Sequence, residues 1–83
     1  MPVSKLEITI EYCIPWDYSS DAVRVAHEIM SEYQHQMVSL TLLPGDKGIF
    51  DVKVNGTLIY SKHITGRFPK PGEVCTELER MTT

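Results

Sequence analysis

The segment 5–33, KLEITIEYCIPWDYSSDAVRVAHEIMSEY, decides the fold because its hydrophobic period changes once, around Cys13. Apolar and polar residues alternate over Lys5–Tyr12, and this alternation predicts a strand with one buried face. From about Pro15 to Tyr33 the apolar residues recur at helical spacing, which predicts an amphipathic helix. The apolar positions of that helix are Ala22, Val25, Ala26, Ile29 and Tyr33.

Two start points are open to this helix. Pro15 suits the first helical position, whereas Ser19, Ser20 and Asp21 are also favoured at helix N-termini. An early start places Cys13 against the helix N-terminus, where the helix dipole favours a thiolate. A late start leaves Cys13 in a loop.

Three more strands and a second helix are predicted after residue 33 by alternation and by turn residues. The pair Asn55-Gly56, between two alternating runs, is typical of a two-residue β-hairpin. The predicted elements are a strand over Met37–Leu43 with Val38, Leu40 and Leu42 on one face, a turn over Pro44–Gly48, strands over Ile49–Val54 and Thr57–Lys62, and a helix from about Gly72 to Met81.

The hairpin register predicts which residues of its two strands face the core. The pairs expected for a two-residue loop are Val54–Thr57, Val52–Ile59 and Phe50–Ser61. On this register the core face carries Phe50, Val52, Val54 and Ile59, and the opposite face carries Ile49, Asp51, Lys53, Leu58, Tyr60 and Lys62. In the last helix the inward positions are Val74, Leu78 and Met81.

The element order is therefore β-α-β-β-β-α, an α/β (two-layer α+β) fold in a single domain over residues 1–83. The first two strands are joined by a helix and should be parallel with a right-handed crossover. Because these two strands are polar on one side, both helices should cover the other face of the sheet. We expect a four-stranded mixed sheet in the strand order two-one-three-four.

The strand directions bring three segments to one end of this sheet. Cys13 follows the first strand, the turn Pro44–Gly48 follows the second, and the loop His63–Pro69 follows the fourth. Ligands of sheets that contain parallel strands favour this end. The sequence therefore predicts a site in which a thiol lies beside two loops rich in glycine, proline and cationic residues.

Composition and charge exclude several classes of protein. The chain has 83 residues, of which 42% are hydrophobic and 23% charged, as in a single globular domain. A net charge of −3 argues against a nucleic-acid partner, and no apolar run approaches the roughly 18 residues of a membrane helix. Residues Met1–Lys5 lack the apolar core of a signal peptide. We expect a cytoplasmic protein with two free thiols.

Four stretches of the chain carry a family resemblance. They are Ile10–Cys13 (IEYC), Gly45–Gly56 (GDKGIFDVKVNG), Ile59–Lys62 (IYSK) and Gly66–Pro69 (GRFP). With these stretches in this order the chain resembles, over nearly its whole length, the selenoprotein W family, the Rdx-type branch of the thioredoxin fold. The resemblance implies a small redox protein, often linked to glutathione, whose first cysteine reacts and whose second completes a C-x-x-C motif.

The motif is incomplete in this chain. Cys13 matches the first position, but Trp16 occupies the second, so dithiol cycling within the motif is excluded. We expect Cys13 to be the nucleophile, with Lys47, His63 and Arg67 favouring its thiolate together with Lys62, and Asp17 opposing it. The alternative is an inert thiol.

Two aromatic residues complete the predicted binding site. Trp16 is either a hydrophobic plug over the loops or a platform for a substrate, and Phe68 is expected to pack against it. Cys75 is either a small apolar filler or a resolving thiol for Cys13. His27, His35 and His63 share no ligand spacing, so no metal site is expected.

Two functions follow from these residues. The first is single-thiol redox chemistry at Cys13, with glutathione or a thiol–disulfide protein as partner and no bound cofactor; such an enzyme would be a glutathione-linked oxidoreductase without a resolving cysteine. The second is a non-catalytic binding module that uses the Trp16 and Phe68 end or the outer sheet face. That face could also support a weak homodimer, through Leu43, Ile49, Leu58 and Tyr60.

Overall fold

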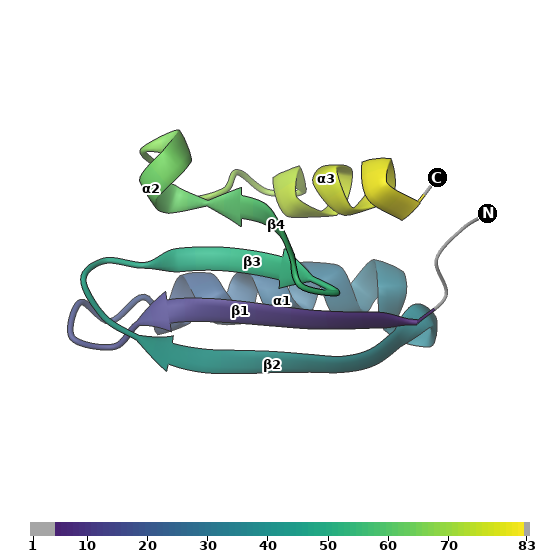
Figure 1. The fold of residues 1–83 in the computed structure, drawn as a ribbon, viewed down its shortest axis with the longest axis horizontal. Coiled ribbons are helices and arrows are strands. Elements are labelled where there is room, and N and C mark those ends of the chain that lie inside the picture. Colours follow the sequence, from purple (N-terminus) through teal and green to yellow (C-terminus); the bar gives the residue numbers. More distant parts are fainter. Residues whose placement is uncertain (1–4, 83) are drawn as a thin grey trace.

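The computed structural model describes residues 5–82, and it confirms the predicted element order (Figure 1). The stretch 1–4, on which the expectation about a signal peptide partly depends, lies outside the described residues. The main elements are β1 (Leu6–Cys13), α1 (Ser19–Tyr33), β2 (Met37–Gly45), β3 (Phe50–Val54), β4 (Thr57–Ser61) and α3 (Glu73–Thr82). Two short helices that the pattern does not predict are a 3₁₀ turn, η1 (Gln34–Gln36), and α2 (Lys62–Thr65).

The sheet has the predicted topology. Its strand order is β2-β1-β3-β4, with β1 and β2 parallel and the two other pairs antiparallel. Both α1 and α3 contribute to one core cluster together with one face of the sheet, so both helices cover the same face. No helix within residues 5–82 has the length and apolar character that crossing a membrane requires.

The core consists of the alternating and helical positions that the sequence marks as apolar. Burial of each large side chain contributes about 1.5–3 kcal/mol, so these positions hold the two layers together. The fully buried large residues are Leu6, Ile8, Ile10, Val25, Ile29, Phe50, Val52, Val54, Val74 and Leu78.

The predicted facing of β4 is only partly right, because the β3–β4 ladder contains a bulge: Ile59 packs against the core as predicted, but Tyr60, predicted on the opposite face, is buried as well. Val54 pairs with Thr57 as expected, but beyond Lys53 the register shifts, and Val52 pairs with Tyr60 instead of Ile59. One extra residue reverses the alternation. Tyr60 is therefore buried in the core, where its hydroxyl donates to the Arg67 carbonyl at 2.6 Å.

The apolar face predicted for β2 is only partly right. The β1–β2 register shifts after Leu6, which pairs with Met37, whereas Glu7 already pairs with Ser39. Val38 is left without a partner in β1 and its side chain is 62% exposed. Leu40 packs against the core, as predicted.

Candidate functional site

The three predicted segments meet at one end of the sheet. The Ile14 N–H donates to the Gly45 carbonyl and the Cys13 N–H to the Ile49 carbonyl, each at 3.0 Å. On the other side of Cys13, the ring centroids of Tyr18 and Phe68 lie 4.7 Å apart. In Figure 1 the turn after β1 and the connection between β2 and β3 lie at the same end of the sheet.

Cys13 is the last residue of β1 and is fully buried. The helix takes the late start, at Ser19, so the thiol is not at a helix N-terminus. Asp17 explains the break, because its φ of 56° is left-handed and cannot continue a right-handed helix. The Tyr18 N–H donates instead to the Cys13 carbonyl at 3.0 Å.

The turn between β1 and α1 presents its side chains to solvent. Ile14 is 50% exposed and Trp16 is 62% exposed. The turn is closed by a hydrogen bond from the Asp17 N–H to the Ile14 carbonyl at 2.9 Å. It is thus held mainly by backbone bonds and buries little apolar surface of its own.

Trp16 lies over the turn between β2 and β3. Gly48 in that turn is buried and has a φ of 74°, and a β-carbon added to it would overlap the Trp16 ring. The indole thus packs on bare backbone while much of its surface stays exposed. This position agrees with the plug interpretation of Trp16.

Tyr18 is a member of the aromatic cluster that the sequence reasoning missed. Phe68 packs edge-to-face on Tyr18 and Phe50, with ring centroids 4.7 and 5.5 Å apart. The ring centroids of Trp16 and Tyr18 are 6.2 Å apart, also in an edge-to-face arrangement. The ring partners of Phe68 are therefore Tyr18 and Phe50 rather than Trp16, contrary to expectation. The spacing Trp16-x-Tyr18, in the segment that directly follows Cys13, is the signal that could have identified it.

Lys62 is the cationic residue that the structure holds against these rings. Its Nζ lies 5.3 Å from the Phe68 ring centroid and 5.6 Å from that of Tyr18, within the range of cation–π attraction. Lys47 and His63 are exposed, Lys47 in the turn before Gly48 and His63 in α2. Their charged or polar ends therefore face solvent at the same end of the sheet.

Arg67 makes a bidentate ion pair with Glu73. Its two terminal nitrogens lie 2.7 and 2.9 Å from the Glu73 carboxylate oxygens. These bonds lower the pKa of Glu73 to about 2 and raise the pKa of Arg67. The charge of Arg67 is thereby neutralised within the chain, so this residue is less available to a thiolate than Lys62.

Glu73→Gln should reduce the loss of unfolding free energy that the parent chain shows as the pH falls below about 5. The folded-state pKa of Glu73 lies below that of an unfolded glutamate, about 4.3, so the ion pair stabilises the fold above that value and is lost as pH falls towards 2. The effect should be small because the pair is partly solvated. Urea midpoints measured between pH 5 and 2, against a Glu77→Gln control in the exposed pair with Arg80, test this. A parallel loss of stability in the parent and Glu73→Gln chains would contradict it.

Cys75 is buried on α3, and both cysteines are free thiols. Burial and a hydrogen bond with Glu32 raise the pKa of Cys75 to about 12, so it stays protonated. Tyr18, directly before α1, bonds the Cys13 carbonyl, whereas Glu32 lies near the other end of α1, about 20 Å along the helix from Ser19. This placement agrees with the filler interpretation. Among residues 5–82 no three His, Cys, Asp or Glu side chains are grouped as metal ligands.

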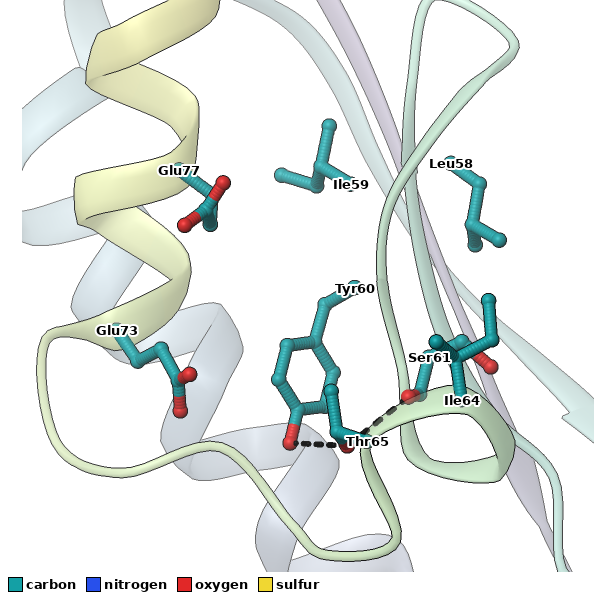
Figure 2. Close-up of a pocket in the computed structure, with 8 residues that line it drawn as sticks. All are labelled: Leu58, Ile59, Tyr60, Ser61, Ile64, Thr65, Glu73 and Glu77. Atoms are coloured by element: carbon teal, nitrogen blue, oxygen red, sulfur yellow. Dashed lines mark hydrogen bonds between the residues drawn. The ribbon is translucent and has the colours of Figure 1, made fainter.

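A groove of about 190 Å³ lies between β4 and α3 (Figure 2), and β4 is the edge strand opposite β2. Ile59 and Tyr60 line it from the strand, and Glu73 and Glu77 line it from the helix. The Thr65 hydroxyl lies 2.9 Å from that of Tyr60 and closes one end. Both carboxylates of the groove are paired with arginines of the same chain, so neither is an unpaired anion.

Comparison with known proteins places this geometry in a family. Residues 7–80 match the model of the Rdx family. The chain is 29% identical over 77 residues to migration and invasion enhancer 1 of Mus musculus and 27% identical over 79 residues to that of Bos taurus. These alignments cover 93% and 95% of this chain, but only 65% and 67% of the two relatives' lengths.

Two crystal structures have the same fold. A selenoprotein W-related protein from Vibrio cholerae superposes with a TM-score of 0.89 at 20% identity, covering 95% of this chain and 99% of that one. A protein from Bordetella parapertussis superposes with a TM-score of 0.87 at 23% identity, covering 98% and 99%. The match over residues 7–80 and this architecture together show that the chain belongs to the Rdx family and has a selenoprotein W-related, thioredoxin-like fold.

Proposed function

We propose that this chain is a thiol redox protein that acts through Cys13 alone, with glutathione as its co-substrate. The position of Cys13 carries the proposal: it ends β1 where the strand-to-helix turn and the β2–β3 turn meet. In an Rdx-family chain this is the place of the reactive cysteine of the C-x-x-C motif. Trp16 at the second position requires that the resolving thiol come from another molecule.

The chemistry balances with glutathione as the only reductant. The Cys13 thiolate attacks the glutathione sulfur of a mixed disulfide, a new S–S bond forms, and the substrate leaves as a thiol after taking up a proton. A glutathione thiolate then attacks the glutathione sulfur bound to Cys13. This second step releases glutathione disulfide and regenerates the Cys13 thiol.

Access to the buried thiol requires local opening of the turn Ile14–Asp17. The turn exposes its side chains already, so opening it costs a few backbone hydrogen bonds and little apolar burial. Lys47 and His63, both exposed at this end, and Lys62 beside the rings are suited to the carboxylates of the tripeptide. Arg67 contributes less to binding of these carboxylates because its guanidinium is already paired with Glu73.

Cys13, rather than Cys75, is expected to form the mixed disulfide when the protein is incubated with glutathione disulfide. Mapping of the adduct by mass spectrometry checks this, with Cys75→Ser retaining the adduct and Cys13→Ser losing it. Trp16 is the chain's single tryptophan, so its fluorescence reports the turn opening in the same sample. An adduct on Cys75 alone, or no adduct under conditions that modify a control glutaredoxin, would contradict the proposal.

The urea dependence of thiol labelling tests the opening step itself. Cys13 should react through local opening, with a rate that rises only weakly with urea compared with global unfolding of the same chain, followed by circular dichroism. Labelling is measured in Cys75→Ser, in which Cys13 is the single remaining thiol. An equal urea dependence of Cys13 labelling and of global unfolding would exclude the local route.

One observation favours a second candidate, a non-catalytic binding module. Cys13 is fully buried while Ile14, Trp16 and Ile64 are 50%, 62% and 76% exposed around the same end of the sheet. Exposed apolar side chains that gather at one end suit a protein partner. Unchanged partner affinity in Cys13→Ser, combined with loss of affinity in Trp16→Ser, would favour the module.

A further inference from the structure

β2 is an open edge of the sheet. It pairs with β1 on one side, and Figure 1 shows no strand or helix beyond its other side. β4, the opposite edge strand, packs against α2 and α3. With nine residues against the five of β4, β2 also offers the longer row of unpaired backbone groups of the two edges of the described sheet.

Apart from Pro44 near its end, β2 has none of the residues that usually discourage pairing of edge strands. Its nine residues, MVSLTLLPG, include no charged side chain, although edge strands usually carry charges that block association. Val38, Leu42 and Leu43 are 62%, 37% and 44% exposed. Two identical strands can thus oppose each other without like-charge repulsion, which favours a second copy of this chain as the partner.

The directions of the backbone N–H and C=O groups of β2 determine the register in which a second β2 strand can pair with it. The Gly45 carbonyl points towards β1, since it accepts from the Ile14 N–H. Alternation then directs the backbone groups of Leu40, Leu42 and Pro44 to the free edge. Pro44 has no N–H and sits at the end of this edge, as proline does in edge strands. An antiparallel pair centred on Thr41 places Leu40 opposite Leu42 of the second copy, with both of their N–H groups able to bond.

The helix beside this edge has a matching apolar flank. Val23 and Met30 are 58% and 47% exposed and, at i and i+7, lie on one stripe of α1. The opposite flank of α1 faces the α3 side, where Glu28 accepts from the Gly72 N–H and Arg24 donates to the Pro69 carbonyl. Val23 and Met30 therefore lie on the flank of α1 that faces the β2 edge.

We propose that the chain forms a homodimer by antiparallel pairing of β2 with β2 of a second copy, around a two-fold axis at Thr41. The axis runs perpendicular to the sheet, so both helical layers stay on one side and the two α1 flanks face each other. The contact is isologous, and closed symmetry limits it to two copies. This inference is independent of the thiol chemistry proposed for Cys13.

Charged substitutions at Thr41, the residue on the two-fold axis, test the proposed dimer. Sedimentation velocity between about 1 μM and 1 mM should show a concentration-dependent dimer of the parent chain. Thr41→Lys and Thr41→Glu each put like charges opposite one another, and each should weaken the dimer about tenfold or more. Mixing these two variants should restore a dimer, because opposite charges then meet. Thr57→Lys and Thr57→Glu, at an exposed threonine on β4, are the matched controls and should dimerise like the parent.

Three results would overturn the dimer. They are a parent chain that stays monomeric to about 1 mM, folded Thr41 variants that dimerise like the parent, and a mixture of the two variants that stays monomeric. The flank of α1 has its own test, because Val23→Glu should weaken dimerisation. Ile64→Glu should not, since Ile64 is the most exposed of the described large apolar residues and lies in α2, beside the opposite edge strand β4. Circular dichroism confirms that each variant is folded.

Discussion

Phe50→Ala is expected to lower the free energy of unfolding by about 3–5 kcal/mol. Phe50 is fully buried at the start of β3 and packs edge-to-face on Phe68 at 5.5 Å. A chain of 83 residues has a total stability of about 4–12 kcal/mol, at roughly 0.05–0.15 kcal/mol per residue. The loss is therefore about a quarter or more of the total stability, and urea titration followed by circular dichroism measures it.

Trp16→Ala is the matched control for this truncation. It removes a larger aromatic ring, but one that is 62% exposed, so the loss should be much smaller than for Phe50→Ala. The comparison separates ring size from burial. If both variants lose the same free energy, Phe50 does not have the central place in the core that its burial indicates.

Trp16→Cys is expected to create a reversible disulfide with Cys13. The two positions have the C-x-x-C spacing, and the turn between β1 and α1 keeps them close through the hydrogen bond from Tyr18 to the Cys13 carbonyl. An internal resolving thiol would release the mixed disulfide without glutathione. In insulin reduction with a thioredoxin-reductase supply, the parent chain should stop at a mixed disulfide, whereas the variant should turn over.

Trp16→Ser separates the new thiol from the loss of the ring. It uncovers the same turn without adding sulfur, so it should label faster at Cys13 than the parent but should not turn over in the insulin assay. Mass spectrometry under oxidising conditions should find an internal disulfide in Trp16→Cys alone. No gain by Trp16→Cys over Trp16→Ser would mean that the geometry at Cys13 differs from that of a dithiol motif in more than one residue.

The sequence predicted the layers well because periodicity reports burial directly. The alternation before Cys13 and the helical repeat after it identified β1 and α1, and the Asn55-Gly56 pair identified the hairpin. The facing of Tyr60 was not predictable by counting, since one bulged residue in β4 reverses every position beyond it. Nothing local in the hairpin sequence marks that bulge.

The convergence of the site was predictable, and its electrostatics were not. Strand direction alone placed Cys13 near the two loops. The bidentate bond between Arg67 and Glu73 joins a loop to α3, and no spacing rule identifies such a pair. The late start of α1 depends on the left-handed backbone of Asp17, a conformation that aspartate adopts only occasionally, and this start leaves Cys13 outside the helix, before the turn that precedes it.

The packing of Trp16 on Gly48 has a consequence for how this chain could evolve. Any side chain introduced at Gly48 meets both the indole ring and a backbone with a φ of 74°, so change at that position is blocked twice. A smaller residue at position 16 meets neither obstacle. Mutational paths from this chain towards a dithiol protein are therefore ordered: position 16 is free to change first, and Gly48 can only follow.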